Sequence, residues 1–336
     1  MTFWKMNCYQ PSVPFCIFKN TMTNIYQINT KNMLQAASVI QKGGLVAFPT
    51  ETVYGLGANV YNPKAVASIY AAKGRPAFNP LISHIADIDF LKDYALTDER
   101  VMALAKHFWP GPLTFVLKRK DENPALDLAC AGLRTITVRM PRHPVALELI
   151  KQSGVPIVAP SANKSQTISP TTATHVADSL GNKVDMILDG GACSVGVEST
   201  IIDLTSKQIV LLRAGGLALE DLEQFLGEKI LISNGNPDLP TSPGQMLKHY
   251  APAHEFRINA LSRKDDEFFI GFGDVKDCDL NLSPKGDLVE AAANLFAYMR
   301  IADTNTRYSK IAMSPIPFEG LGLAINDRIK RAAYKK

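Results

Sequence analysis

Residues 45–84 have the sequence LVAFPTETVYGLGANVYNPKAVASIYAAKGRPAFNPLISH. They open with an apolar run, residues 45–48, which predicts a buried strand that Pro49 ends. A turn follows in which hydroxyl groups and glycines are concentrated: Thr50, Thr52, Tyr54, Gly55 and Gly57. So many hydroxyl groups directly after a buried strand are unusual for a plain connection.

A helix and a second strand follow this turn. Asn62 and Pro63 form a typical helix start, because Asn accepts hydrogen bonds from the free amides and Pro tolerates the first helical position. The helix ends at a Gly-Pro corner that carries Lys73 and Arg75, and His84 lies in the next predicted strand. Each residue alone has an ordinary explanation, since a cation in the last helical turn is favourable against the helix dipole. Their convergence in one stretch predicts a functional site.

The composition is typical of a soluble globular protein. Of the 336 residues, 20% are charged and 46% are hydrophobic, and the length predicts two domains. The net charge of +4 allows a basic groove for nucleotide or RNA phosphates. It is far smaller than the charge of a dedicated nucleic-acid binder.

The location expected from the sequence is the cytoplasm. No apolar run approaches the length of a membrane span, and the first residues lack the pattern of a signal peptide. The five cysteines have no metal-ligand spacing, which favours reduced thiols. Met22 begins a more plausible start than Met1, so residues 1–23 are expected to be an N-terminal extension.

Strand and helix signals alternate up to residue 230 and predict an α/β domain with a mixed sheet. In the strand at residues 135–140, alternation places Thr135 and Arg139 on a polar face, which a solvated face would explain equally well. A Pro-bounded loop follows the strand at residues 156–159. Its short polar side chains suit turn chemistry, but they also follow the end of a strand, where open α/β sheets place ligands. These side chains are Ser161, Asn163, Ser165 and Ser169.

A Pro-, Gly- and Asn-rich linker follows at residues 231–254. A link of this length is usually functional or disordered, and the apolar and aromatic residues in its second half, such as Tyr250, argue against a free tether. Residues 255–336 predict a small second α/β domain. It has neither a phosphate-loop lysine motif nor GxGxxG, so it shows no sign of a nucleotide site of its own.

Several motifs together resemble one family. PTETVYGLG, KGRP, NPLISHI, TVRMP, PSAN, VESTIID and LLRAGG occur in the order and spacing of the threonylcarbamoyl-AMP synthases. With the PTSPGQMLKHYAP linker, the chain resembles the long, two-domain form of that family over residues 24–334. The resemblance implies a YrdC-like catalytic domain at residues 24–230 with a twisted mixed sheet and flanking helices. It also implies a linker at residues 231–254 that acts as a lid, and a small Rossmann-like domain at residues 255–336.

The resemblance further implies a nucleotidyltransferase that converts L-threonine, bicarbonate or CO2 and ATP into threonylcarbamoyl-AMP and pyrophosphate. This is the first step of the threonylcarbamoyladenosine modification of tRNA, which a downstream transferase complex completes, and contact with tRNA is a possibility. The reaction needs positioning and charge neutralisation, so no protein nucleophile is expected. Mg²⁺ is expected to arrive with ATP, and no protein metal ligand is assigned.

Site residues carried over from the family fall into two groups. Lys73 and Arg75 would position the triphosphate and neutralise its charge, and Arg139 would anchor the threonine carboxylate as a planar, two-pronged cation. The other nucleotide contacts would be Asn79, Thr135, Ser161, Asn163, Ser169, Arg213 and Tyr250. The other threonine contacts would be Thr52, His84, the main chain near Ala159, and Ser199. A hydrogen bond to the substrate hydroxyl would make valine a poor substitute, whereas serine would be rejected by only about 1–3 kcal/mol.

Two alternatives remain. A non-enzymatic module could use Lys73, Arg75, Arg139 and Arg213 to bind RNA phosphates, although the small hydroxyls and His84 suit a small ligand better. Carbamoyl-adenylate enzymes of hydrogenase maturation contain a similar domain, but they carry paired CxxC zinc motifs that this sequence lacks.

Overall fold

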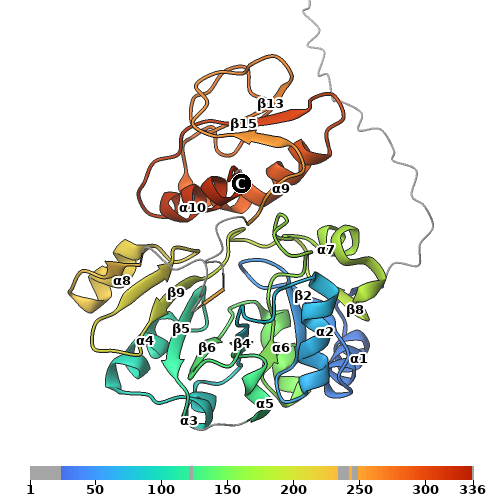
Figure 1. The fold of residues 1–336 in the computed structure, drawn as a ribbon, viewed down its shortest axis with the longest axis vertical. Helices are drawn as coiled ribbons and strands as arrows, with labels where there is room; N and C mark the ends of the chain where they lie inside the picture. Colours follow the sequence, from blue (N-terminus) through green and yellow to red (C-terminus); the bar gives the residue numbers. More distant parts are fainter. Residues whose placement is uncertain (1–23, 121–123, 234–241, 244–248, 335–336) are drawn as a thin grey trace, which may run out of the picture.

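A computed structural model describes residues 24–120, 124–233, 242–243 and 249–334. The expected N-terminal extension, Lys248 and most of the proline-rich part of the linker lie outside these residues. The described chain forms two α/β units, a large one built on an eleven-stranded sheet and a small one built on a four-stranded sheet (Figure 1). None of the helices in the described part of the chain is long and apolar enough to cross a membrane.

The large sheet contains parallel and antiparallel neighbours. Its strands are β1 Ile25–Gln27, β2 Val46–Phe48, β3 Gly55–Asn59, β4 Ile82–His84, β5 Leu113–Lys118, β6 Thr135–Arg139, β7 Ile157–Val158, β8 Met186–Asp189, β9 Thr200–Asp203, β10 Val210–Arg213 and β11 Leu231–Ile232. Their order is β1-β8-β2-β3-β7-β4-β6-β5-β9-β10-β11. The pair β4–β6 is parallel and β5–β6 is antiparallel, so the predicted mixed sheet is confirmed.

Helices flank this sheet, and their ends follow capping rules. They are α1 Thr30–Gln41, α2 Pro63–Lys73, α3 Leu91–Tyr94, α4 Glu99–Phe108, α5 Pro124–Asp127, α6 Pro144–Ser153, α7 Ala173–Leu180 and α8 Leu219–Leu226. The predicted start of α2 is confirmed, because the Asn62 side chain accepts from the amides of Lys64 and Ala65. Gly74 ends this helix with φ +61°, a left-handed conformation that glycine adopts without strain.

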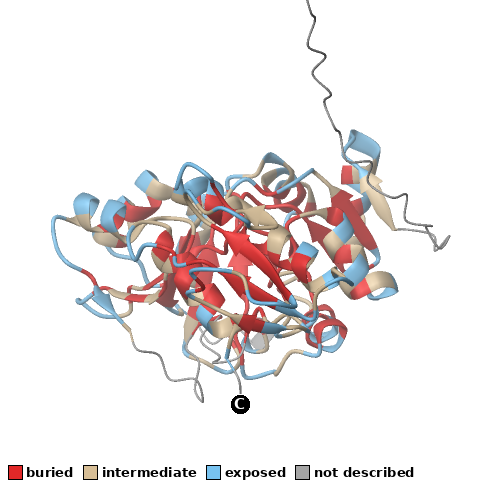
Figure 2. Cartoon of the chain, turned by 90° about the horizontal axis from the view of Figure 1, so that it is seen from above, coloured by how far each residue is buried: buried red, intermediate tan, exposed pale blue. Residues whose placement is uncertain are grey.

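The core of the large unit lies on both faces of its sheet. One apolar cluster contains Tyr54, Leu56 and Phe115, and a second contains Phe48 with residues of α1 and α6. Figure 2 shows buried residues along the central strands and exposed residues on the helices around them. Burial on both sides explains why the strands read as continuous apolar runs.

The turn predicted around Gly55 and Gly57 is wrong. Both residues lie in β3, which pairs with β2 in an antiparallel ladder. Their role is close packing, because a Cβ on Gly57 would lie 2.7 Å from the Phe48 ring and 2.9 Å from Ile157. Glycine therefore marks a close approach of neighbouring groups in a strand here, and not a turn.

The small unit is a parallel sheet covered by two helices. Its elements are β12 Glu255–Arg257, β13 Glu267–Gly271, β14 Leu280–Asn281, α9 Leu288–Thr304, β15 Lys310–Met313 and α10 Gly322–Ala332. The strand order is β12-β15-β13-β14 and every pair is parallel. The predicted second α/β unit is therefore confirmed.

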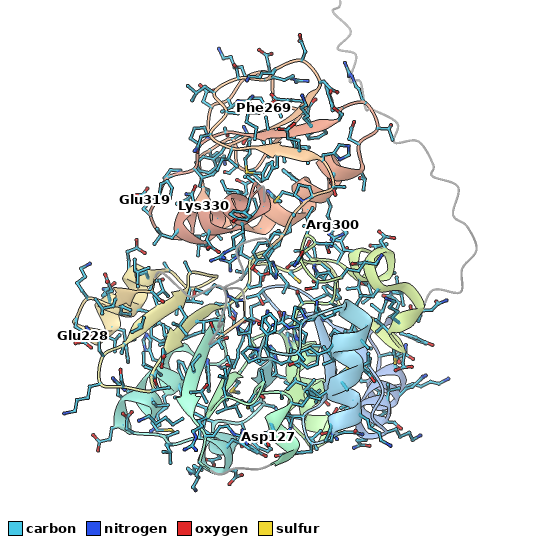
Figure 3. All side chains as sticks on the ribbon, in the orientation of Figure 1. Asp127, Glu228, Phe269, Arg300, Glu319 and Lys330 are labelled. Atoms are coloured by element: carbon cyan, nitrogen blue, oxygen red, sulfur yellow. The ribbon has the colours of Figure 1, made fainter. Side chains whose placement is uncertain are left out.

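Helices α9 and α10 lie between the small sheet and the large unit (Figure 1). Their apolar cluster also includes Val53, Ile168 and Val197 of the large unit, so the two units share buried apolar surface. Figure 3 shows Arg300 of α9 at this junction, where its Nη2 donates to the Ile168 carbonyl oxygen. The large and small units are therefore held together by apolar packing as well as by polar contacts.

Candidate active site

A pocket of about 560 Å³, including the solvent at its mouth, lies on the large unit beside the linker. His84 ends β4, Arg139 ends β6 and Arg213 ends β10, so strand ends supply much of its wall. This is where open α/β sheets bind ligands. The predicted site residues that line it are Thr52, Arg75, His84, Arg139, Ala159, Ser161, Ser199, Arg213 and Tyr250.

Arg139 is fixed in the pocket wall by its neighbours. Its Nη2 donates to Glu51 Oε1 at 2.6 Å, its Nη1 to Thr52 Oγ1 at 2.9 Å and its Nε to the Gly111 carbonyl oxygen at 3.2 Å. The second oxygen of Glu51 accepts from the Arg142 amide at 3.1 Å. The pocket therefore presents a planar cation in one orientation, which suits a ligand carboxylate.

Glu51 keeps its charge although it is buried. Burial raises the pKa of its carboxyl group, but the charge and hydrogen bond of Arg139 and the backbone hydrogen bonds from Glu51 and Arg142 together lower it by more, so the net shift is downward. Both side chains of the pair are almost inaccessible to solvent. Removal of either partner would leave a buried charge unpaired, which is strongly destabilising.

His84 contributes a neutral imidazole to the wall. Burial and the nearby charge of Arg139 lower its pKa to about 3. Its Nδ1 lies 3.2 Å from the Ile82 carbonyl oxygen, and its ring meets Phe48 edge to face. A neutral imidazole has one donor and one acceptor nitrogen, so it suits a hydroxyl group better than an anion.

Ser199 and Arg213 form a second polar group in the wall. The Ser199 hydroxyl lies 2.7 Å from Thr114 Oγ1, and Arg213 Nη2 approaches it at 3.1 Å. Arg213 also donates to the main-chain oxygens of Ser199, at 2.8 Å, and of Pro243, at 3.3 Å. Burial lowers the pKa of Arg213 to about 10, so the guanidinium remains charged at neutral pH.

Lys73 does not line the pocket. Its Nζ donates to the carbonyl oxygens of Ser161 and, at 2.6 Å, Asn163, and it lies 3.4 Å from Asn163 Oδ1. Burial and the adjacent Arg75 charge lower its pKa well below the usual value. Lys73 thus ties the end of α2 to the loop at residues 160–170, here called the PSAN loop, which in turn presents Ser161 to the pocket.

Arg75 lines the pocket and is held by main-chain groups. Its Nε donates to the Asn79 carbonyl oxygen at 3.3 Å and its Nη2 to that of Pro80 at 3.0 Å. Asn79 is buried outside the lining, and its carbonyl also accepts from the Tyr70 hydroxyl. The segment after α2 therefore supports the Arg75 side chain through its backbone.

The remaining predicted residues lie outside the lining. The Asn163 amide donates to the Thr167 carbonyl oxygen at 2.9 Å, inside the PSAN loop. Ser169 donates to Glu198 at 2.7 Å. Thr135 begins β6 whereas Arg139 ends it, so the two lie about 13 Å apart along the strand.

The linker contributes Pro243, His249 and Tyr250 to the pocket wall. The Tyr250 ring stacks on Phe296 of α9 with ring centroids 5.3 Å apart. The next residue, Ala251, donates its amide to the Gln166 carbonyl oxygen at 2.9 Å. The linker is therefore attached to both the PSAN loop and the small unit.

Sequence reasoning missed Glu51, Thr114, Glu198 and Arg328, which all contact pocket residues. Glu51 and Glu198 lie inside the motifs PTETVYGLG and VESTIID. The presence of a charged residue among the hydroxyl groups of each motif could have identified them as part of the site. Arg328 lies in α10, and its side chain is fully buried. Within the described residues, no group of three or more His, Cys, Asp or Glu side chains could hold a metal ion.

Two family models match this chain. The model described as "Telomere recombination" matches residues 38–215, and the model described as "Threonylcarbamoyl-AMP synthase, C-terminal domain" matches residues 217–334. Threonylcarbamoyl-AMP synthase of Pyrococcus abyssi is 44% identical over 89% of this chain and 93% of its own. That of Bacillus subtilis is 40% identical over 93% of this chain and 96% of its own.

Solved structures of a related protein are also similar to this chain over most of its length. The crystal structure of Pyrococcus abyssi Sua5 complexed with L-threonine matches with a TM-score of 0.85 and 40% identity, over 92% of this chain and 97% of that one. The structure of a doubly substituted variant of the same protein matches with a TM-score of 0.84 and 39% identity, over 93% of this chain and 96% of that one. The similarity therefore extends over both units.

Proposed function

Because this chain belongs to the family of threonylcarbamoyl-AMP synthases, we propose that its pocket binds L-threonine and ATP next to each other. The reaction converts L-threonine, bicarbonate or CO2 and ATP into threonylcarbamoyl-AMP and pyrophosphate, and it begins the threonylcarbamoyladenosine modification of tRNA. One observation carries the proposal for the site. Three guanidinium groups, those of Arg75, Arg139 and Arg213, converge on a pocket that also contains hydroxyl groups and a neutral imidazole.

For threonine, we propose that Arg139 binds the carboxylate while His84 and Ser199 bind the hydroxyl group. The fixed orientation of Arg139 and the neutral state of His84 support these roles. Thr52 and the main chain at Ala159 complete this half of the site. The L-threonine bound to the related Sua5 supports a threonine site in this family.

For ATP, we propose that Arg75 and Arg213 neutralise the phosphates, with Ser161 and Tyr250 lining the same half of the pocket. Four further residues would act indirectly, by holding neighbouring groups of the site in place: Lys73, Asn79, Asn163 and Ser169. Thr135 has no supporting contact in the pocket and stays a prediction from the family resemblance.

The chemistry we propose is an adenylyl transfer, which makes the enzyme a nucleotidyltransferase. A carbamate oxygen formed on the threonine amine attacks the α-phosphorus, and the bond to pyrophosphate breaks. Negative charge accumulates on the leaving group, where Arg75 and Arg213 would stabilise it. The carbamate is itself the nucleophile, so no side chain has to form a covalent intermediate.

Magnesium fits this site as a companion of ATP. Glu198 is the carboxylate that lines the pocket in the described residues, and Ser169 and Arg328 already occupy its two oxygens. Mg²⁺ usually keeps several waters and binds substrate phosphates with few protein ligands. Bound in this way, it would supply charge neutralisation during pyrophosphate release.

We propose that residues 24–230 bind and react the substrates. Within the linker at residues 231–254, β11 completes the large sheet and the part after it covers the nucleotide, and residues 255–336 support that cover. The position of Pro243, His249 and Tyr250 along the pocket supports the covering role. The product is a labile mixed anhydride, so exclusion of water would preserve it. A transferase complex that modifies tRNA would consume it, which places the protein, by this proposal, in the cytoplasm.

The test is pyrophosphate release from Mg-ATP and bicarbonate with and without L-threonine. Arg139→Lys keeps the charge opposite Glu51 but loses the planar fork. We expect it to raise KM for threonine about 10- to 100-fold, because a hydrogen bond to a charged group contributes about 1.5–3 kcal/mol. KM for ATP should change little.

Arg75→Lys is the matched variant for the nucleotide half. It should raise KM for ATP and leave KM for threonine nearly unchanged. If wild-type protein shows no threonine-dependent release, the proposed reaction is wrong. If the two variants affect the same substrate, the division of the pocket is wrong.

A further inference from the structure

Glu198 is an anion in a pocket that we assign to anionic phosphates, and it has no role in the reaction proposed above. Its Oε1 accepts from Ser169 at 2.7 Å, and its Oε2 accepts from Arg328 Nε at 3.0 Å. The Arg328 side chain is fully buried and that of Glu198 is 10% exposed. Both oxygens of Glu198 thus accept a hydrogen bond, and Arg328 supplies the opposite charge where solvent has little access.

Arg328 reaches this pair from α10 of the small unit. Its Nη1 donates to the Ala214 carbonyl oxygen at 2.7 Å and to Asp327 Oδ2 at 3.0 Å. Its Cζ lies 5.5 Å from the centroid of the Tyr250 ring, within cation–π distance. One side chain therefore contacts an acid of the pocket, the residue after Arg213 and an aromatic of the pocket wall.

Arg213 is the cation that would replace Arg328 if the pair were broken. Among pocket-lining groups its charge acts strongly on Glu198: burial raises the pKa of Glu198, but Arg328 and then Arg213 lower it to about 2. In the structure Arg213 donates to Ser199 and Pro243. Arg213 makes these contacts while Arg328 is bonded to Glu198.

We propose that Arg328 is a positioning residue that sets the charge of the nucleotide half of the pocket from the small unit. It neutralises Glu198 and packs under Tyr250, so that Arg213 faces the ATP phosphates and not Glu198. The inference rests on the proposed function only in identifying those phosphates as the ligand. No side chain of residues 255–334 lines the pocket itself, so this influence passes through the groups that Arg328 contacts: Glu198, the Tyr250 ring and the Ala214 carbonyl next to Arg213.

The test measures the Kd of Mg-ATP by calorimetry for Arg328→Met and for the double variant E198Q/R328M. Arg328→Met should weaken ATP binding about tenfold or more, because an unpaired buried carboxylate then competes for Arg213. The double variant removes that carboxylate and should bind ATP within about threefold of wild type. A structural role alone would not predict this rescue.

Arg257→Met is the matched control, because it breaks an ion pair of the same small unit, with Glu267, outside the pocket. It should destabilise the fold and leave the ATP Kd unchanged. If Arg328→Met does not fold, the ATP Kd of the single variant E198Q tests the proposal instead. This variant should bind ATP at least as tightly as wild type.

Three results would overturn the proposal: an unchanged ATP Kd in folded Arg328→Met, no rescue in the double variant, or weaker ATP binding in E198Q. The assay does not depend on turnover. Failure of threonine-dependent pyrophosphate release would therefore reject the proposed reaction while leaving this measurement valid.

Discussion

His84 and His249 are buried imidazoles whose pKa values lie far below that of free histidine. Burial is the main cause in both cases and lowers each pKa to about 3. In the unfolded chain the pKa is about 6.5, so the unfolded state binds more protons between pH 6.5 and 3. The contribution of these two neutral histidines to the free energy of unfolding is therefore complete above pH 6.5 and is lost as the pH falls toward 3.

We expect the free energy of unfolding to decrease by about 2 kcal/mol per histidine between pH 8 and pH 5. Denaturant titrations at several pH values measure this slope. His84→Gln should reduce it, because it removes one of the two buried imidazoles. Equal slopes in His84→Gln and wild type would contradict the buried, neutral state of His84.

Strands β2 and β3 show what close packing requires of a sequence. Gly57 faces Phe48 and Ile157 at distances that leave no room for a Cβ. Gly57→Ala should lower the free energy of unfolding by about 1–3 kcal/mol, since overpacking forces neighbouring groups to shift. Thermal or urea denaturation measures the change.

Phe48→Leu provides the control for this prediction, because it withdraws the ring atom nearest to Gly57. The double variant G57A/F48L should lose less stability than the sum of the two single variants. Additive losses would show that the glycine is needed for its backbone and not for the space that it leaves.

Local rules predicted the elements whose signals are local. The caps at Asn62 and Gly74 determine both ends of α2, and the period-two pattern of residues 135–140 identified β6. β3 could not be predicted, because its glycines are explained by Phe48 and Ile157 across the sheet. Gly55 and Gly57 read as turn residues only while these partners are unknown.

Local sequence signals are also insufficient for contacts that join the two units at the candidate active site. Arg139, His84 and Arg213 end three strands, so the sequence could group them through the rule for strand ends. The contact of Arg328 with Glu198 joins residues that are 130 positions apart in two different units. No periodicity or cap in α10 indicates that partner, so only the folded chain reveals it.

Removal of the small unit tests how the two units cooperate. A chain ending at residue 233 loses Tyr250, Arg328 and the cover of the shared apolar cluster that contains Val53. We expect its circular dichroism to show a folded large unit and its threonine-dependent pyrophosphate release to fall well below that of the full chain. Turnover equal to that of the full chain would show that the linker and small unit have no part in the reaction.

The dependence of the pocket on α10 also has a consequence for protein synthesis. Domains fold in order as the chain leaves the ribosome, so the large unit can form before α10 has been translated. Glu198 would then face the pocket without its buried cation, and Tyr250 would lack the guanidinium of Arg328 beside its ring. Full catalytic competence is therefore a late event in the life of each molecule, and a nascent chain stalled before α10 should make little of the reactive anhydride.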